Sequence, residues 1–330
     1  MLQLKNNTPF SASLALFPNE SAIDTLYIIT KASFNIGPKW TLTEEQSSPV
    51  EADEYWSEPG KSSIKYASDF HTGKLATDIV MLGHAYSPNA KEVTQMDVQL
   101  SVGPVAKTVR VFGDREWKNG HPTPAKPFKS MAMVYEKAYG GMHVAEGQIQ
   151  SAEIRNLVGR GYAGQRKEKE MNGVPLPNLE DPNHLITKIE DQPNPACYGF
   201  SAPNWQPRLS YAGTYDEQWQ EHRAPYLPKD FDKRFFTMAH PELVYPGYLT
   251  GGESVIIEGM HPSGPMQFNL PQVSLAASVK VSGAIERPVF RNETLLLEPN
   301  QSTLSMIWKA SMPCDKKALK IEEVNISLTR

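Results

Sequence analysis

The chain has 330 residues, of which 33 are Lys or Arg and 37 are Asp or Glu, so its formal net charge is −4. An apolar share of 40% and a charged share of 21% are typical of a globular protein and exclude a disordered or fibrous chain. A nearly balanced charge provides no long-range field for nucleic acid or an anionic membrane surface, so we expect neither as a partner.

The first third of the chain predicts strands. Residues 26–36 alternate between apolar and other side chains, the period of a strand with one buried face. Residues 78–82 form a short apolar run, which predicts a strand buried on both faces. Residues 97–102 and 108–112 alternate again, and each run ends at a glycine turn.

The middle, residues 118–246, is rich in proline and aromatic residues. The whole chain has 27 Pro against 22 Gly, and proline interrupts both helices and central strands. We therefore expect long, ordered loops and few helices here. The best helix candidates are residues 216–223 and residues 230–239, where Asp230 could cap the N-terminus.

The last third predicts strands again, at residues 253–258, 278–285, 293–298 and 303–310, with a hairpin turn at 298–301. Near the end the apolar phase shifts, which a bulge around Glu322 and Glu323 would explain. The expected fold class is mainly β: antiparallel, strand-rich, sandwich- or barrel-like portions with long Pro-rich ordered loops and few short helices.

No motif in the sequence predicts catalysis, a cofactor or a metal. Residues 159–164 match G-x-G-x-x-G, but no apolar helix pattern follows them, which favours a structural turn over a dinucleotide loop. Residues 252–256 lack the second glycine of a nucleophile elbow. The eight His show no helical i, i+4 pair for zinc.

The two Cys and the hydropathy pattern indicate the compartment. Two widely spaced Cys suit free thiols in a reducing environment. No apolar run reaches the ~18 residues that a transmembrane helix needs. We therefore expect a cytoplasmic protein.

An enzyme remains the alternative class. Asp216 and Asp232 lie beside loop aromatics, as in a carbohydrate-active β protein whose carboxylates act while aromatic rings stack on sugars. That chemistry needs two carboxyl groups facing each other across a cleft, which sequence does not reveal.

Aromatic and charged residues cluster between residues 205 and 236, a composition typical of protein interfaces. The alternative is that these aromatics only hold loops against a sheet. The residues predicted to bind a partner are Trp205, Arg208, Tyr211, Asp216, Trp219, Phe231, Arg234 and Phe236.

Several blocks of the chain occur in the order found in a known bacterial family. They include Thr8-Pro-Phe10, a long block from Asp69 to Pro88, Val111 to Trp117, and the run Leu227-Pro-Lys-Asp-Phe-Asp-Lys-Arg-Phe-Phe. The other matching blocks are residues 135–141, 156–162, 176–182, 213–219 and 251–253. On these blocks the chain resembles the family catalogued as domain of unknown function 2169, over roughly residues 3–271.

That resemblance implies a non-catalytic adaptor, or effector chaperone, of the type VI secretion system. Such a protein would bind a cognate secreted toxin in the producing cell and help load it onto the VgrG spike or its tip protein. Strand addition at a sheet edge and aromatic pockets are the two recognition modes that stay open. The sequence does not indicate the oligomeric state.

The same resemblance sets the expected domain organisation. Residues 1–271 would form the family-like domain, with a strand-rich part at 1–117 and the Pro- and aromatic-rich middle at 118–246. Residues 272–330 would add C-terminal strands that pack on it. The chain has Glu242-Leu243 where the family pattern usually has Asp-Gln, so no shared polar role is carried over there.

Overall fold

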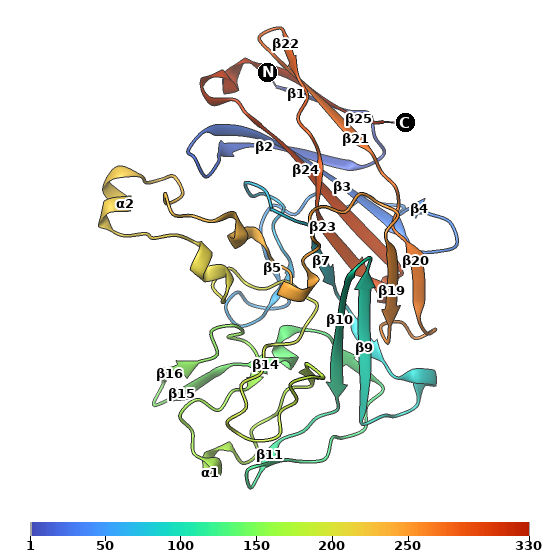
Figure 1. Ribbon diagram of the computed structural model, residues 1–330, viewed down its shortest axis with the longest axis vertical. Helices are drawn as coiled ribbons and strands as arrows, with labels where there is room; N and C mark the ends of the chain where they lie inside the picture. Colours follow the sequence, from blue (N-terminus) through green and yellow to red (C-terminus); the bar gives the residue numbers. More distant parts are fainter. Residues whose placement is uncertain (1, 330) are drawn as a thin grey trace.

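A computed structural model describes residues 2–329, without the side chain of Lys316, and shows an elongated arrangement of β-sheets (Figure 1). Strands account for 40% of the residues and helical segments for 11%. The two α-helices are short, α1 (Glu168–Met171) and α2 (Glu217–His222). The mainly β class expected from the strand periodicity and the proline content is therefore confirmed.

The central sheet joins strands from both ends of the chain. Its order is β2 (Ser11–Pro18), β3 (Asp24–Asn35), β24 (Thr303–Pro313), β23 (Arg291–Glu298) and β7 (Asp78–Met81), with β4 (Thr41–Leu42) paired to β3. All pairs are antiparallel except β23 with β7. The apolar run at β7 is buried on both faces, as predicted. A short 3₁₀ turn, Pro299–Gln301, connects β23 to β24 at the predicted hairpin position.

A four-stranded sheet packs on one end of the central sheet. Its order is β1 (Gln3–Asn6), β25 (Ile321–Leu328), β21 (Leu275–Val281) and β22 (Ala284–Glu286). Leu26 and Ile28 of β3 bury against Val279, Val324 and Ile326 of this sheet. The strand expected at 278–285 is in fact two strands, because residues 282 and 283 have positive φ and make a tight turn.

The predicted bulge is confirmed in β25. Lys280 pairs with Glu323 and Val281 pairs with Ile321, so Glu322 is the extra residue. A bulge of this kind shifts the side-chain phase by one position. That shift lets Ile321 and Val324, three positions apart, both point into the core.

A five-stranded sheet packs on the other end, in the order β18 (Leu179–Glu180), β10 (Val105–Phe112), β9 (Gln95–Val102), β19 (Ser254–Glu258) and β20 (Met266–Asn269). Val98, Leu100 and Val109 of this sheet join Leu295 and Met306 of the central sheet in the largest core cluster. Each sheet is open, and no sheet in the described part closes on itself into a barrel.

Both faces of β3 are buried, which corrects the prediction of one buried face. The polar face of the strand lies under the loop that follows β4. Lys31 Nζ donates to the Ser48 carbonyl at 3.4 Å, and Ser33 Oγ lies 3.3 Å from Ser47 Oγ. The alternation of apolar and polar residues predicted that this face is exposed to solvent, but polar atoms of the loop cover it instead.

Two of the C-terminal strands, β23 and β24, are part of the central sheet, whereas β21, β22 and β25 form the four-stranded sheet with β1. β24 pairs with β3 from Thr303–Asn35 to Pro313–Thr25, and β23 continues the sheet to β7. The division of the chain that we expected at residue 271 therefore does not coincide with a division between sheets.

The first part of the middle, drawn in green to yellow-green, adds loops and short strand pairs beside β9 and β10 in the lower part of the view in Figure 1. A small separate core holds it together, formed by Trp117, Tyr139, Met171, Leu176 and Ile186. The remaining strands are β5 (Glu54–Tyr55), β6 (Ile64–Tyr66), β8 (His84–Tyr86), β11 (Trp117–Lys118), β12 (His121–Pro122), β13 (Ser130–Ala132), β14 (Tyr139–Gly140), β15 (Met142–Ala145), β16 (Gln148–Ala152) and β17 (Arg160–Gly161).

The G-x-G-x-x-G segment lies in this lower part and has a structural role. Its residues 160–161 form β17, which runs parallel to β14. A Cβ at Gly159 would lie 2.7 Å from the Ala138 carbonyl oxygen, and Gly161 has a φ of +90°. The glycines are therefore required because the two backbone segments lie too close for a Cβ. This agrees with the prediction of a structural turn.

Candidate functional site

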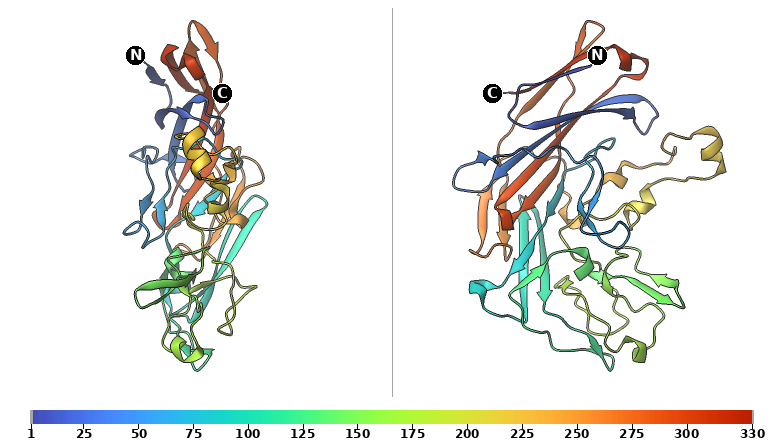
Figure 2. Two further views of the ribbon diagram at one scale, coloured as in Figure 1. Left: turned by 90° about the vertical axis from the view of Figure 1, so that its left-hand side faces the viewer. Right: turned by 180° about the vertical axis from the view of Figure 1, so that it is seen from behind.

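One segment leaves the body of the protein, and we call residues 209–232 the arm. The arm carries α2 and projects sideways from the sheets in Figure 1 and in the view from behind (Figure 2, right). Two contacts with Glu20 hold it near the body: Arg223 donates to the Glu20 carbonyl at 2.9 Å, and Lys233, just after the arm, lies 2.8 Å from its carboxylate.

The helix predicted at 216–223 is confirmed as α2. Its N-cap is Asp216, whose carboxylate accepts a hydrogen bond from the Trp219 amide at 2.8 Å. This is the usual role of aspartate at a helix start.

The helix predicted at 230–239 is wrong in extent and in its cap. Only a 3₁₀ turn forms, at Lys233–Phe236, and Asp232 caps it. Asp230 instead accepts hydrogen bonds from the amide and the hydroxyl of Thr214, at 3.0 and 2.8 Å. Because Asp230 joins the two ends of the arm, it is not free to cap a helix.

The arm exposes large apolar side chains that are held in place. Leu209 is 50% exposed, Tyr215 54% and Tyr226 40%. The half-buried Trp219 packs edge-on against Tyr215 with ring centroids 4.7 Å apart, and its Nε1 donates to the Tyr226 carbonyl at 2.8 Å. The arm therefore presents ordered aromatic rings to solvent, and ordered rings lose little conformational entropy on binding.

Trp205 does not share this surface. It is 2% exposed and packs edge-on against Tyr135 at 5.2 Å in the largest core cluster. We therefore assign Trp205 to the core rather than to a partner-binding surface. Phe231 and Phe236 are half-buried at the base of the arm, where Phe236 stacks on His71 at 4.9 Å.

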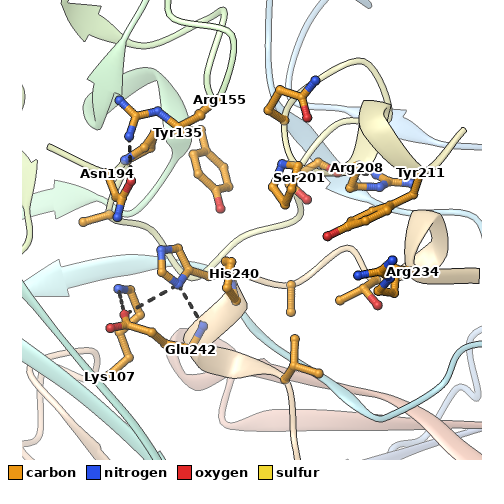
Figure 3. A pocket seen from close by; sticks show the side chains of 18 of the residues that line it. Lys107, Tyr135, Arg155, Asn194, Ser201, Arg208, Tyr211, Arg234, His240 and Glu242 are labelled. Atoms are coloured by element: carbon orange, nitrogen blue, oxygen red, sulfur yellow. Dashed lines mark hydrogen bonds and ion pairs between the residues drawn. The ribbon is translucent and has the colours of Figure 1, made fainter. Parts of the chain in front are cut away.

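A cavity of about 600 Å³ lies at the base of the arm (Figure 3). Tyr211 and Arg234 come from the arm side, Lys107 from β10, and His240 and Glu242 from the turn after the arm. Apolar and aromatic side chains provide much of the remaining lining: Leu75, Ala76, Tyr135, Pro195, Ala196, Pro207, Ala239, Pro241 and Val244.

Three of the four permanent cations that line the cavity are paired with carboxylates. Lys107 lies 2.5 Å from Glu242, Arg155 lies 2.6 Å from Glu153, and Arg234 lies 2.6 Å from Asp232. Arg234 also lies over the Tyr211 ring at 4.2 Å. His240 is neutral at pH 7, because burial and the nearby Lys107 lower its pKa to about 4.

Arg208 is the fourth cation, and it has no carboxylate within ion-pair distance among the described residues. The side chain is 4% exposed and reaches the cavity from the 3₁₀ turn Arg208–Tyr211. Its Nε donates to the Phe235 carbonyl at 2.9 Å, and its Nη1 donates to the Ser201 carbonyl. Burial lowers its pKa to about 10, which still leaves it charged at pH 7.

A buried charge network lies on the polar face of the central sheet, beneath Phe236. Lys309 of β24 lies 3.1 Å from Glu293 of β23 and donates to the His71 carbonyl at 3.1 Å. Lys74 lies 2.5 Å from Asp78, which also accepts from the Met238 amide at 2.8 Å. These charged side chains are at most 8% exposed.

Burial determines the protonation of this network. It lowers the pKa of Lys309 to about 8 and lowers that of His71 well below its usual value, whereas it raises the pKa of the Asp69 carboxyl. The sequence analysis used residues 69–78 only for the family resemblance. A signal was available in Lys74 and Asp78: Asp78 begins a strand buried on both faces, and Lys74 stands four positions before it.

The geometry of the acidic residues bears on metal binding and on the carbohydrate-active alternative. Residues 2–329 bring together no group of three or more His, Cys, Asp or Glu that could hold a metal ion. Asp216 and Asp232 do not line the cavity. Hydrogen bonds from Arg234 lower the pKa of Asp232, the opposite of what a general acid needs. Within the described residues, no helix is long and apolar enough to cross a membrane.

Comparison with known proteins gives one match. A family model described as an uncharacterized protein conserved in bacteria, DUF2169, matches residues 22–309. The match includes the arm, the cavity and the buried charge network, and it extends past residue 271 into β24. No curated protein and no solved structure matches the chain.

Proposed function

Because the chain belongs to the bacterial family DUF2169, we propose that it is a non-catalytic adaptor of the type VI secretion system. In this role it binds a cognate effector toxin in the cytoplasm of the producing cell and assists its loading onto the VgrG spike or the spike tip. The class of activity comes from the family resemblance that the sequence blocks indicate. The structure adds an exposed aromatic surface of a kind that binds proteins.

The observation that carries the proposal is the arm. Exposed apolar patches rimmed by polar residues mark protein interaction sites, and the arm groups several exposed apolar side chains on one projecting segment. The Tyr215 and Trp219 rings pack edge-on, Trp219 also donates to the Tyr226 backbone carbonyl, and the cavity opens beside the base of the arm. Aromatic anchors of this kind provide much of the binding energy in protein interfaces.

Of the two recognition modes, the arm and cavity favour pockets and anchors over strand addition. The outer strand β22 has three residues, and the outer strand β2 ends at Pro18, which cannot donate a backbone hydrogen bond. The carbohydrate-active alternative has no specific observation in its favour, because Asp216 caps a helix and Asp232 pairs with Arg234.

Removing this protein from its host should lower the cellular amount of one toxin encoded nearby, or prevent its secretion. The expected cause is that an unprotected toxin is degraded or misses the spike. The measurement is the abundance of type VI toxins in cells and in medium, with and without the gene. Restoring the wild-type gene is the control. If every toxin is made and secreted normally without this protein, the proposal is wrong.

A further inference from the structure

We propose that the cavity at the base of the arm binds a carboxylate on an otherwise apolar peptide segment of the carried protein, with Arg208 as its charge partner. The inference rests on the proposed function, because it takes the occupant to be part of the carried protein. The inference adds to the proposed function the chemical class of the bound segment, and it names Arg208 as the residue that recognises that segment.

The first step is the charge of the lining. Lys107, Arg155 and Arg234 each have a carboxylate within 2.6 Å, so their charges are compensated. Arg208 has no carboxylate at ion-pair distance among the described residues: it donates to two carbonyl oxygens and lies over the Phe235 ring, and Asp53 and Asp78 act on it only from farther away. A buried charge without a partner is costly, and an anion entering the cavity would remove that cost. Asp181 also lines the cavity, so the complement to a negative charge is local to Arg208 rather than a property of the whole lining.

The second step is geometry. A guanidinium has five N–H donors, and the two hydrogen bonds to Phe235 and Ser201 use one from Nε and one from Nη1. The two donors on Nη2 have no partner among the described residues, and one on Nη1 remains. The two carbonyl bonds also fix the plane of the group. A pre-oriented guanidinium with free end-on donors suits the two oxygens of a carboxylate.

The third step is the rest of the lining. Tyr211, Pro207, Pro241 and Val244 provide an apolar and aromatic wall that would receive the aliphatic or aromatic part of a residue. A phosphate fits less well, because it carries more than one negative charge at neutral pH and only one cation is uncompensated. The cavity volume of about 600 Å³ accommodates a few residues of peptide.

The test uses three probes on the purified full chain: N-acetyl-phenylalanine, its C-terminal amide, and acetyl-Ala-Ala-Phe. Binding is followed by chemical-shift changes in amide spectra. We expect N-acetyl-phenylalanine to bind at least about ten-fold more tightly than the uncharged amide, with shifts around Tyr211. Equal affinity for the acid and the amide would overturn the inference.

Two variants locate the effect. Arg208→Gln should remove the preference for the acid, and Arg208→Lys should keep part of it. If Arg208→Gln does not fold, Leu75→Glu replaces it, since Leu75 lines the cavity yet is 54% exposed. Leu75→Glu should weaken the binding of N-acetyl-phenylalanine and leave the binding of its amide unchanged. Ile285→Glu lies on the distant β22, where Ile285 is 56% exposed, and should change the affinity for neither probe. A preference for the acid that survives both Arg208→Gln and Leu75→Glu contradicts the assignment.

The tripeptide separates a peptide segment from a free metabolite. A site for a chain segment should bind acetyl-Ala-Ala-Phe at least as tightly as N-acetyl-phenylalanine, and weaker binding of the tripeptide would contradict the peptide part of the inference. These experiments use no toxin. A negative result with the probes would therefore leave the adaptor proposal intact. If instead no toxin depended on this protein in its host, the adaptor proposal would be wrong, but the probe result would still stand.

Discussion

Replacing Trp205 with alanine should destabilise the protein by about 3–5 kcal/mol, the usual cost of truncating a fully buried tryptophan. The side chain is 2% exposed and packs against Tyr135 within the largest core cluster, so its removal leaves a cavity. The measurement is the shift of the unfolding midpoint in denaturant. The sequence had placed Trp205 on a binding surface, and this variant separates the two roles.

The matched control for that variant is Tyr215→Ala in the arm. Tyr215 is 54% exposed, and surface substitutions of this kind change stability by no more than about 0.5 kcal/mol. If Trp205→Ala leaves the unfolding midpoint unchanged, Trp205 does not lie in the core and returns to the partner-binding residues.

Replacing Glu293 with glutamine should destabilise the protein by about 3–5 kcal/mol at neutral pH, because it removes one partner of a buried ion pair. The substitution keeps the size of the side chain and leaves the Lys309 ammonium without the carboxylate 3.1 Å away. Both side chains are at most 7% exposed, so water does not replace the lost charge.

The pH dependence of this loss has a definite sign. Burial already lowers the pKa of Lys309 to about 8 in the native protein, and loss of Glu293 lowers it further. The unfolded chain then binds one more proton than the folded variant, so the stability of the variant rises with pH. The deficit relative to wild type should therefore narrow as the pH rises towards about 8, the pKa of Lys309 in the folded wild type. Above that pH the deficit should stay constant, because both folded proteins then hold a neutral lysine.

A surface ion pair serves as the control for the buried one. Lys5 and Glu323 lie 2.5 Å apart with side chains 46% and 30% exposed. Glu323→Gln should cost less than about 1 kcal/mol, since exposed pairs contribute little. Equal losses in Glu293→Gln and Glu323→Gln, or a deficit that does not change with pH, would contradict the role of the buried network.

Much of the fold could be predicted, because strand periodicity and turn residues are local properties of the sequence. The runs that form β3, β7, β9, β10 and β24 were recognised in this way, and even the bulge at Glu322 left a visible phase shift. The burial of the polar face of β3 could not be predicted. It depends on the loop after β4 folding back over Lys31 and Ser33, a tertiary contact that the alternation of the strand does not encode.

The site was harder to predict, because a cluster of aromatic residues has the same composition in a core and on a surface. Trp205 and Trp219 are fourteen positions apart, yet Trp205 lies in the core and Trp219 lies on the projecting arm. The cavity joins Lys107 of β10 to Arg208 and His240, and no local pattern connects these residues. The lone buried charge of Arg208 depends on which carboxylates the fold brings near, which only the three-dimensional structure shows.

The most direct test of the central claim is a titration of the cognate toxin against the wild-type chain and an arm variant, Tyr215→Ser with Tyr226→Ser. A matched control replaces two exposed residues far from the arm, Ile285→Ser with Val289→Ser. We expect the arm variant to bind the toxin at least about 30-fold more weakly, the equivalent of one hot-spot residue, with an unchanged unfolding midpoint. The control should bind like wild type. Unchanged affinity of the arm variant would contradict the claim that the arm holds the partner.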